Sequence, residues 1–247
     1  MFKARITDDL YLDVPDALQK IYTNFEPCTT QVILDNLKEG DVFLDVGANF
    51  GFFSVLAASI VGPAGMVYAV EASPSVLPIL ASNTGAFENV RIVASAAGNR
   101  TGTTQFFMTD DFVNSGVARS PFIDKVETTS VGIDTLDNLL RREPTFDGRV
   151  SFIKCDVQGD EVAVLEGLAE TIEMNAPLQL IAEWAPAWMS NAGFAPAEFP
   201  AFIRGLGFTE VAVVDDYLKR LMSLEEMEQE FRNDTSGKRF CNVFASK

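Results

Sequence analysis

The chain contains no histidine among its 247 residues, and this absence removes whole classes of active site. Histidine is the commonest general base and a frequent nitrogen ligand of metal ions. Without it, no Ser-His-Asp or Cys-His arrangement and no His-ligated metal centre can form. Any acid–base chemistry must therefore use carboxylates, lysine, tyrosine or cysteine, or depend on positioning alone.

Cysteines and long apolar runs are also scarce. Cys28, Cys155 and Cys241 lie far apart and form no C-x-x-C pair, which argues against a disulfide framework and a zinc site. No run approaches the roughly 18 apolar residues of a membrane span. The first residues lack the apolar segment of a signal peptide. We expect a cytoplasmic protein with no membrane partner.

Positive charge is in short supply. Lys and Arg total 19 against 35 Asp and Glu, so the net charge is −16. Proteins that bind a phosphate backbone need clustered Lys and Arg, and we therefore expect no nucleic-acid partner. The acidity itself is best explained as a solvated surface. A hydrophobic fraction of 47% supplies a sizeable core and excludes disorder.

The most informative segment has the sequence DVGANFG and spans residues 45–51. Apolar runs at 42–44 and 52–58 flank it, which indicates a buried strand, a tight turn and a helix. Glycines permit the sharp turn and the close approach of a ligand. In a doubly wound sheet, ligands bind at the carboxyl ends of the strands. The predicted cofactor-binding residues of this turn are Asp45, Gly47, Asn49, Phe50 and Gly51.

A second strand, at 66–70, ends in Glu71, about 20 residues after Gly51. A carboxylate at this place can accept hydrogen bonds from both hydroxyls of a ribose. A dinucleotide and S-adenosylmethionine both satisfy this pattern. The glycine spacing is not G-x-G-x-x-G, and Asp45 would repel a pyrophosphate, whereas it could hold the amino-acid end of S-adenosylmethionine. The sequence favours S-adenosylmethionine.

Strand and helix patterns alternate along the rest of the chain. Further strands are expected at 90–94, 149–156 and 178–183, an antiparallel pair at 208–214 and 238–244, an edge strand at 103–108, and a helix that Ser73 caps. This alternation predicts an α/β fold with a doubly wound, mostly parallel seven-stranded sheet. We expect residues 1–40 to form an N-terminal helical cap and residues 41–247 the cofactor-binding domain. The oligomeric state is not indicated.

A set of motifs, in order, resembles those of the FkbM-type class I methyltransferases. They are FEP at 25–27, GDVFLDVGANFG at 40–51, VEASP at 70–74, AAGN at 96–99, NSG at 114–116, VGIDTL at 131–136, IKCDVQGDE at 153–161, LEG at 165–167 and IAE at 181–183. The resemblance covers residues 25 to 184. Two residues depart from the family pattern: Gln158 stands where Glu is frequent, and Cys155 where an aliphatic residue is usual.

The resemblance implies transfer of a methyl group from S-adenosylmethionine, usually to an oxygen of a sugar or secondary metabolite. We therefore expect a hydroxyl of a small molecule or saccharide as the acceptor. The adenine lies after the third strand in this fold, which adds Ser95 and Ala96 to the cofactor-binding residues, and Ala72 joins them beside Glu71. The acceptor pocket is expected from the loops 109–124 and 184–195.

Two carboxylates at strand ends, Asp156 and Glu183, are the candidate catalytic residues. Either could act as the base toward a substrate hydroxyl, and Asp156 is also counted among the cofactor-binding residues. Its alternative role is to cap the helix that follows. The pair could bind a divalent cation through oxygen ligands, but we do not favour this, and no metal site is predicted. The alternation of strand side chains is taken to direct Lys154 away from the crevice.

Two other functions remain open from the residues. A nicotinamide-dependent oxidoreductase shares the strand, glycine turn, helix and ribose carboxylate. A binding module could keep the S-adenosylmethionine site and lack turnover. Either alternative would use the same fold.

Overall fold

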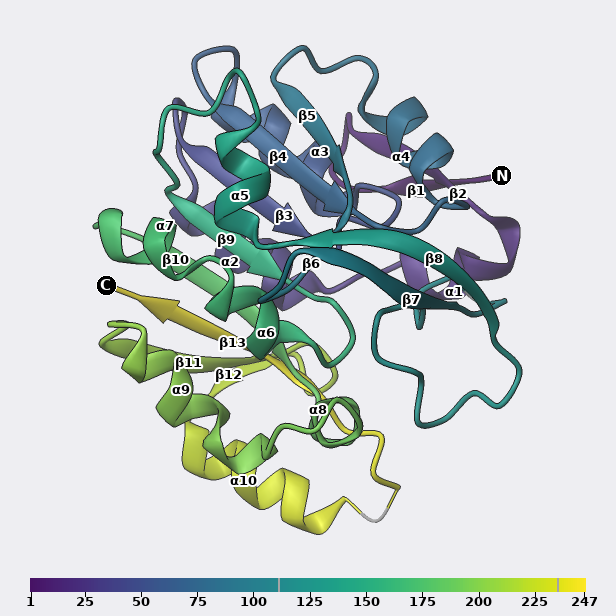
Figure 1. Cartoon of the computed structure of the whole chain (residues 1–247), viewed down its shortest axis with the longest axis vertical. Helices are drawn as coiled ribbons and strands as arrows, with labels where there is room; N and C mark the ends of the chain where they lie inside the picture. The colour runs from purple at the N-terminus through teal and green to yellow at the C-terminus, as the bar shows by residue number, and fades with distance from the viewer. Residues whose placement is uncertain (111, 235) are drawn as a thin grey trace.

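The computed structural model describes residues 1–110, 112–234 and 236–247, and an eight-stranded sheet forms its centre (Figure 1). Across the sheet the strands are β12 (Arg220–Met222), β11 (Glu210–Asp215), β13 (Cys241–Ser246), β10 (Gln179–Trp184), β9 (Phe152–Cys155), β3 (Val42–Val46), β4 (Met66–Glu71) and β5 (Val90–Ala94). The five strands from β10 to β5 are parallel, and β13 lies antiparallel between β10 and β11. The predicted fold class is confirmed. The eighth strand is the short β12, which extends the edge beyond the seven predicted strands.

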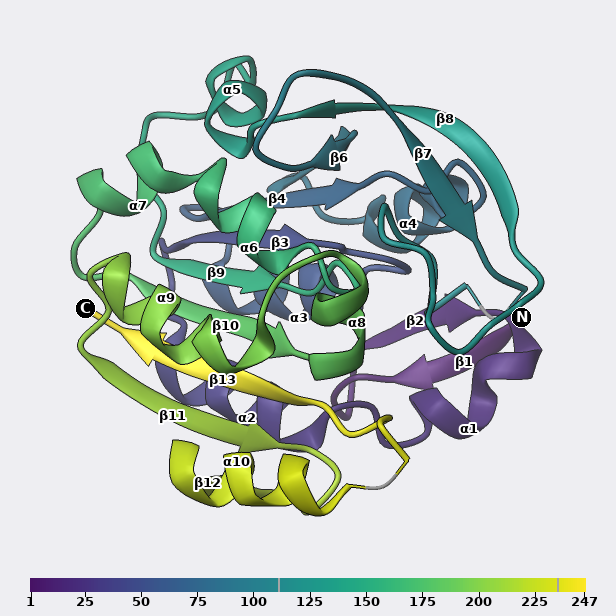
Figure 2. The ribbon, with the colours of Figure 1, turned by 60° about the horizontal axis from the view of Figure 1, so that its bottom comes forward.

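Helices cover both faces of the sheet (Figure 2). On one face lie α2 (Pro27–Asn36), α3 (Phe52–Val61) and α4 (Leu77–Thr84); on the other lie α5 (Leu136–Arg141), α6 (Glu161–Glu166), α7 (Ala169–Met174), α8 (Pro186–Asn191), α9 (Phe199–Gly205) and α10 (Leu224–Asn233). Within the described residues, no helix is both long and apolar enough to cross a membrane.

Neighbouring residues of β3 point to opposite cores, as strand geometry requires. Leu44 belongs to the core under α5 to α10, whereas Phe43 belongs to the core under α2 to α4. The Phe43 ring stacks on Phe152 of β9, with 5.5 Å between ring centroids. Because β3 is buried on both faces, all its residues except Asp45 are apolar. Asp45 lies near the carboxyl end of the strand, at the edge of the sheet where ligands bind in this fold.

The order of the strands places the site. The chain runs from β3 outward through β4 to β5, and then crosses to β9 and β10 on the other side of β3. The carboxyl ends of β3 and β9 therefore flank the point where the direction of winding reverses. This is the point at which doubly wound sheets bind ligands.

Smaller elements surround the sheet. They are the hairpin β1 (Phe2–Arg5) and β2 (Tyr11–Val14), the short helices η1 (Asp16–Leu18), α1 (Gln19–Tyr22) and η2 (Pro196–Glu198), and a second sheet of β6 (Ala96–Ala97), β8 (Glu127–Asp134) and β7 (Gly102–Met108). The expected edge strand at 103–108 thus pairs in a separate sheet. The N-terminal segment adds a hairpin to the expected helices, and its buried Leu12 and Tyr22 share a core with α3. The domain boundary at residue 40 stays a prediction.

The helix expected to start at Ser73 begins four residues later, at Leu77. The Ser73 carbonyl accepts hydrogen bonds from the backbone N–H groups of Val76 and Leu77, both at 3.1 Å. The Ser73 hydroxyl contacts Ser75 instead of capping a helix N–H group. The predicted cap is therefore wrong, and these residues form a turn that precedes α4.

Candidate active site

The turn after β3 packs tightly against β9. Gly47 has a φ of 81°, and a Cβ added there would lie 1.8 Å from the backbone oxygen of Asp156. Gly51, with a φ of 88°, directly precedes α3. The N–H groups of Gly47 and Ala48 both donate to the Val70 carbonyl at 3.0 Å. Glycine is favoured at both positions because a side chain would strain the turn, and at Gly47 it would also force β3 and β9 apart.

Glu71, at the end of β4, is held by the backbone of this turn. One carboxylate oxygen accepts a hydrogen bond from the Asn49 N–H at 2.8 Å, and the other from the Ser73 N–H at 2.7 Å. Burial raises the pKa of Glu71, while these two N–H groups act in the opposite direction. The carboxylate is thereby fixed in orientation before any ligand arrives.

A cavity of about 420 Å³ opens between these elements. Nine of the predicted site residues line it: Asp45, Gly47, Asn49, Glu71, Ala72, Ser95, Ala96, Asp156 and Glu183. Phe50 and Gly51 do not. The Phe50 side chain is fully buried and packs edge-on against the rings of Tyr22 and Phe112. Its side chain therefore supports the turn from the core instead of facing the cavity.

The two loops expected to surround the acceptor also reach the cavity. Residues 112–117 of the first loop and Trp188 of the second line it. Asn191 donates a hydrogen bond to the Arg119 carbonyl at 2.6 Å, which joins the two loops. Asp111, which belongs to the first loop, lies outside the described residues. The acceptor role of both loops stays a prediction.

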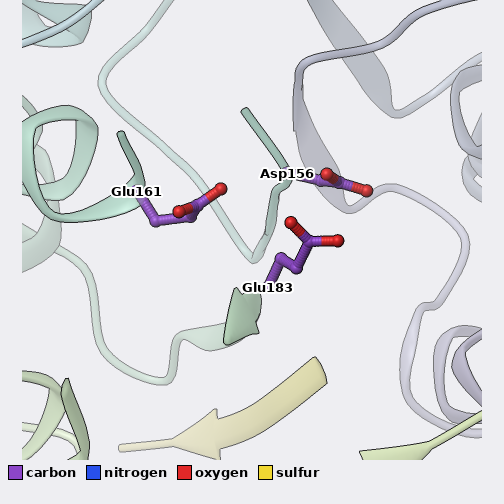
Figure 3. A group of neighbouring side chains, drawn as sticks. All are labelled: Asp156, Glu161 and Glu183. Atoms are coloured by element: carbon purple, nitrogen blue, oxygen red, sulfur yellow. The ribbon is translucent and has the colours of Figure 1, made fainter. Parts of the chain in front are cut away.

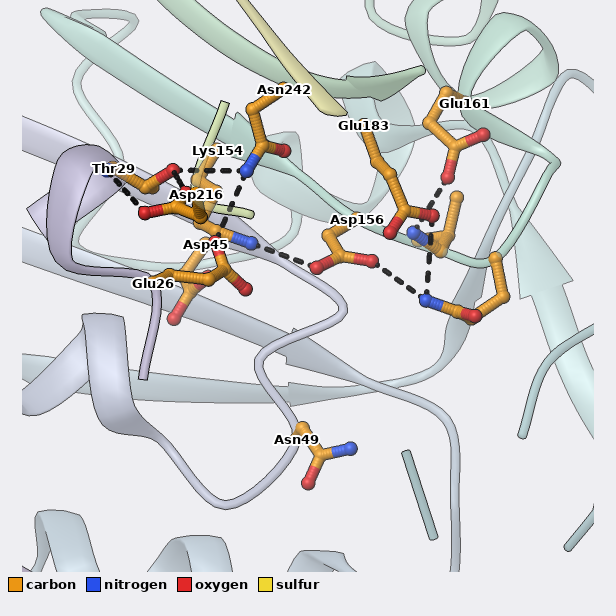
Figure 4. A network of polar contacts seen from close by, with 12 residues as sticks. Glu26, Thr29, Asp45, Asn49, Lys154, Asp156, Glu161, Glu183, Asp216 and Asn242 are labelled. Atoms are coloured by element: carbon orange, nitrogen blue, oxygen red, sulfur yellow. Dashed lines mark hydrogen bonds and ion pairs between the residues drawn. The ribbon is translucent and has the colours of Figure 1, made fainter. Parts of the chain in front are cut away.

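Lys154 points into the cavity, contrary to the prediction. Its Nζ lies 3.0 Å from Asp156 Oδ2 and 4.6 Å from the centre of the Phe53 ring, and the side chain is 3% exposed (Figure 4). Strand side chains alternate, so residues 154 and 156 share one face while Cys155 points to the other. Burial lowers the pKa of Lys154, but the carboxylates of Asp156, Glu26 and Asp45 outweigh it and raise the pKa above its usual value. Lys154 is a buried ammonium group.

Asp45 lies beside this lysine. Its carboxylate accepts a hydrogen bond from the Ser54 hydroxyl of α3 at 2.5 Å, and the residue is 2% exposed. Burial raises the pKa of Asp45, whereas the charge of Lys154 and the hydrogen bond from Ser54 lower it. This contact joins Asp45 to α3 through a serine side chain inside the helix, and Asp45 does not cap the N-terminus of α3.

Gln158 joins the two candidate catalytic carboxylates. Its Nε2 donates to Asp156 Oδ1 at 3.0 Å and to Glu183 Oε2 at 3.5 Å (Figure 4). Asp156 is thus contacted at one oxygen by a lysine and at the other by an amide. Burial raises the pKa of Glu183 well above its usual value, and the nearby charges of Asp156 and Glu161 add to this effect. Burial and these neighbouring charges both disfavour the ionised form of Glu183.

Glu161, on the first turn of α6, completes a group of three carboxyl groups with Asp156 and Glu183 (Figure 3). One oxygen of each residue lies within 4.8 Å of the others. Glu161 Oε1 accepts hydrogen bonds from the Val157 and Gly159 N–H groups, at 3.0 and 3.1 Å. The side chain is fully buried, and burial raises its pKa to about 8. Protonation of Glu161 can therefore reduce the negative charge of the three carboxyl groups without a bound cation.

Three residues of this region are not among the predicted site residues. Lys154 was assigned to the wrong face, although the i, i+2 relation to Asp156 is itself a sequence signal. Glu161 belongs to the IKCDVQGDE motif, but only the turn around Gly159 reveals that its carboxylate folds back under the motif. Glu26, in the FEP motif, also lines the cavity. Burial raises the pKa of Glu26 to about 7.

The charge of the lining fits S-adenosylmethionine and not a pyrophosphate. Among the described lining residues the ionisable acids are Glu26, Asp45, Glu71, Asp156, Asp160 and Glu183, and the single base is Lys154. Carboxylates attract a sulfonium and an ammonium group and repel phosphates. The fixed Glu71 carboxylate suits the hydroxyls of a ribose.

Comparison with known proteins identifies a family and a shared fold. The model of the Methyltransferase FkbM domain family matches residues 45–210. The crystal structure of methyltransferase FkbM from Methylobacillus flagellatus KT has a TM-score of 0.51 and 12% identity, covering 94% of this chain and 53% of that chain. Precorrin-6y C5,15-methyltransferase from Geobacter metallireducens GS-15 has a TM-score of 0.51 and 17% identity, covering 96% and 98%. Both likenesses concern the fold.

A curated relative matches over a shorter segment. Ribosomal RNA small subunit methyltransferase A from Rubrobacter xylanophilus is 44% identical over 64 residues, which are 26% of this chain and 23% of that protein. The chain therefore spans less than a quarter of that relative. The family model, by contrast, covers the strands that build the cavity. The chain belongs to the FkbM methyltransferase family, and its cofactor is S-adenosylmethionine, as the sequence predicts.

Proposed function

We propose that this protein is an O-methyltransferase that acts on a hydroxyl group of a small molecule or saccharide. The observation that carries this proposal is the Asp156 carboxylate at the end of β9, contacted by Lys154 at 3.0 Å on one oxygen and by Gln158 at 3.0 Å on the other. Asp156 is 20% exposed at its side chain and lines the cavity. It can therefore accept a proton from a hydroxyl that enters the cavity.

The residues that hold the cofactor follow from the sequence prediction and the cavity lining. Glu71 receives the ribose hydroxyls, Ser95 and Ala96 lie along the adenine, with Ala72 beside the ribose, and Asp45, Gly47 and Asn49 hold the amino-acid end. Phe50 and Gly51 support this arrangement by shaping the turn. When bound, S-adenosylmethionine supplies a methyl group that its sulfonium has already activated.

Little else is then required of the protein. Correct placement of reacting groups can contribute about 7–11 kcal/mol in favourable cases. Glu183, 3.5 Å from the Gln158 amide, is placed to orient the acceptor hydroxyl toward Asp156. The absence of histidine does not oppose this mechanism, because one carboxylate base suffices.

The acceptor is proposed to be a small molecule or saccharide and not a nucleic acid. The net charge is −16, and the lining of the cavity is acidic. Nucleic-acid binding depends on Lys and Arg that neutralise phosphates. The three cysteines are unpaired, which agrees with the proposed cytoplasmic location.

The test compares Asp156→Asn and Glu183→Gln with the wild type. Formation of S-adenosylhomocysteine is measured with a panel of hydroxyl acceptors, and the methylated atom of the product is identified by NMR. If Asp156 is the base, its amide variant loses about 10²–10⁴-fold in turnover, while the affinity for S-adenosylhomocysteine and the melting temperature stay nearly unchanged. Glu170→Gln, at an exposed carboxylate that lines neither of the two main cavities, is the control.

Four outcomes contradict parts of the proposal. A methylated nitrogen or carbon in the product would exclude an O-methyltransferase. Full activity in both amide variants would reduce Asp156 and Glu183 to scaffold residues. Loss of wild-type activity on chelation, with recovery on adding Mg²⁺, would show that the carboxylates bind a metal ion. Cofactor binding without transfer to any acceptor would instead indicate a binding module.

A further inference from the structure

A second cavity, of about 580 Å³, adjoins the cofactor cavity. Segments far apart in the sequence form it: Ile21 and residues 24–26 of the N-terminal region, Asp216 and Tyr217 after β11, and parts of residues 230–242 around the start of β13. Four residues line both cavities, namely Ile21, Phe25, Glu26 and Phe240. The two cavities therefore meet at this shared wall.

Glu26 stands at the meeting point in an unusual backbone conformation. Its φ of 38° and ψ of 61° are left-handed, which is uncommon for a residue other than glycine. It directly precedes α2, but its side chain does not cap that helix. Asp216 does so instead, by accepting from the Cys28 N–H at 2.6 Å and from the Thr29 hydroxyl at 2.6 Å (Figure 4). The Glu26 side chain is thus free of a capping role.

The Glu26 carboxylate turns toward the interior. One oxygen, Oε2, accepts a hydrogen bond from the Asn242 Nδ2 of β13 at 3.2 Å. Within the described part of the chain, the other oxygen has no hydrogen-bond partner. Strained residues of this kind cluster at binding sites, where the surrounding structure holds them in place. Glu26 therefore offers an acceptor oxygen to a ligand that spans the two cavities.

Charge selects the kind of ligand. The second cavity adds the acids Asp216, Glu230 and Asp234 and the bases Lys238 and Arg239 to the lining. Both bases have partners: Arg239 forms an ion pair with the buried Asp215, and Lys238 lies over the Phe122 ring at 5.4 Å. A phosphate or carboxylate would thus meet mostly acidic groups, whereas a hydroxyl or ammonium group would meet acceptors.

Aromatic rings supply the rest of the wall. Phe25, Tyr217 and Phe240 line the second cavity, and Tyr217 is 81% and Phe240 52% exposed. An exposed ring offers a flat apolar face, while the neighbouring Asn24, Asn233 and Ser236 offer polar groups. This combination complements a ring-shaped ligand with apolar faces and a hydroxylated edge.

We propose that the second cavity binds the methyl acceptor, that Glu26 orients it toward Asp156, and that the acceptor is a cyclic polyol, neutral or amine-bearing, without phosphate. This inference rests on the proposed function. Glu26 is in this view a positioning residue for the acceptor. The cofactor occupies the first cavity, and the acceptor extends from the second cavity past the shared residues, so that its reacting hydroxyl lies in the first.

The test uses saturation-transfer NMR on the protein loaded with S-adenosylhomocysteine. The probes are methyl glucoside, glucosamine and glucose 6-phosphate at millimolar concentrations, where weak ligands are detected. We expect signals from the first two probes and none from the phosphate. Glu26→Gln should weaken glucosamine binding about tenfold, a change of about 1.4 kcal/mol. Asn24→Trp, which fills the second cavity alone, should remove both signals, and Asn24→Ala should keep them.

Equal binding of glucose 6-phosphate, signals that survive Asn24→Trp, or no signal from any probe would each overturn the inference. Calorimetry with S-adenosylhomocysteine on the same variants separates this failure from that of the proposed function. Asn24→Trp should leave that affinity unchanged. If the wild type binds no S-adenosylhomocysteine, the proposed function fails, and the probe signals recorded without it still decide the role of the second cavity.

Discussion

The two sides of the cofactor cavity hold their carboxylates in opposite ways. On the β4 side, both oxygens of Glu71 accept hydrogen bonds from backbone N–H groups, one from Asn49 in the glycine turn and one from Ser73 just after β4. On the β9 side, the Gln158 amide donates to both Asp156 and Glu183, and Lys154 contacts Asp156. Behind them, Glu161 accepts hydrogen bonds from two backbone N–H groups at one oxygen, and its other oxygen has no partner among the described residues. Backbone N–H groups thus fix Glu71, whereas side chains contact Asp156 and Glu183, the two carboxyl groups that line the cavity on the β9 side.

This difference separates binding from chemistry. A carboxylate fixed by backbone N–H groups is already oriented, so little side-chain entropy is lost when a ligand binds to it. Carboxylates crowded in a buried site have displaced pKa values, as proton-transfer groups require. We therefore expect substitutions on the β4 side to change cofactor affinity, and substitutions on the β9 side to change stability, pH dependence and turnover.

Lys154→Met should have the largest effect on stability. The substitution keeps the apolar stem but removes the only described cation that lines the cavity, which leaves Asp156 without its ion-pair partner. Breaking a buried ion pair in this way costs about 3–5 kcal/mol. Urea unfolding at neutral pH measures the change. Lys20→Met, at an exposed position, should stay within about 0.5 kcal/mol of the wild type. A loss as small as the control's would show that the β9 side does not depend on this charge.

Gly47→Ala should destabilise the protein by about 1–3 kcal/mol, because its Cβ would overlap the Asp156 carbonyl at 1.8 Å. It should also weaken binding of S-adenosylhomocysteine, since β3 and β9 must move apart. Gly205→Ala is the matched control, because nothing lies within 4 Å of its added Cβ. Thermal unfolding and calorimetry test both effects. Unchanged affinity in Gly47→Ala would separate the turn from cofactor binding.

The smallest effect is a slope in the pH dependence of stability. Burial raises the pKa of Glu161 to about 8 in the folded protein, whereas an unfolded glutamate titrates near pH 4.3. Between these values the folded state binds a proton that the unfolded state lacks, so its contribution falls as pH rises, by about 1.4 kcal/mol per pH unit. Unfolding free energies of wild type and Glu161→Gln at pH 5.5 and 7.5 measure it. The variant should lose this slope, and an identical slope in both proteins would contradict a protonated Glu161.

The same contrast explains how much could be predicted from the sequence. The β4 side is local: the glycine turn and Glu71 lie within one strand–helix–strand unit, and their spacing predicts their place. Asp156 and Glu183 were found as strand ends. Glu26, Asp216 and Asn242 come from three separate parts of the chain, next to α2, after β11 and in β13, so no local sequence pattern predicts that they lie together.

Two elements of the C-terminal region were not predicted. Helix α10 is one of them, although its Ser223 and Glu226 form a capping box, which is a sequence signal. The eighth strand, only three residues long, has no pattern of its own.

Calorimetric titration of S-adenosylhomocysteine into the wild type, Glu71→Ala and Glu183→Gln tests the central claim most directly. A hydrogen bond to a charged group contributes about 1.5–3 kcal/mol, so loss of the Glu71 carboxylate should weaken binding by at least about tenfold, with melting temperatures recorded to show that the variant is folded. Glu183→Gln should bind as the wild type does. No binding to the wild type, or equal affinity in Glu71→Ala, would contradict the account.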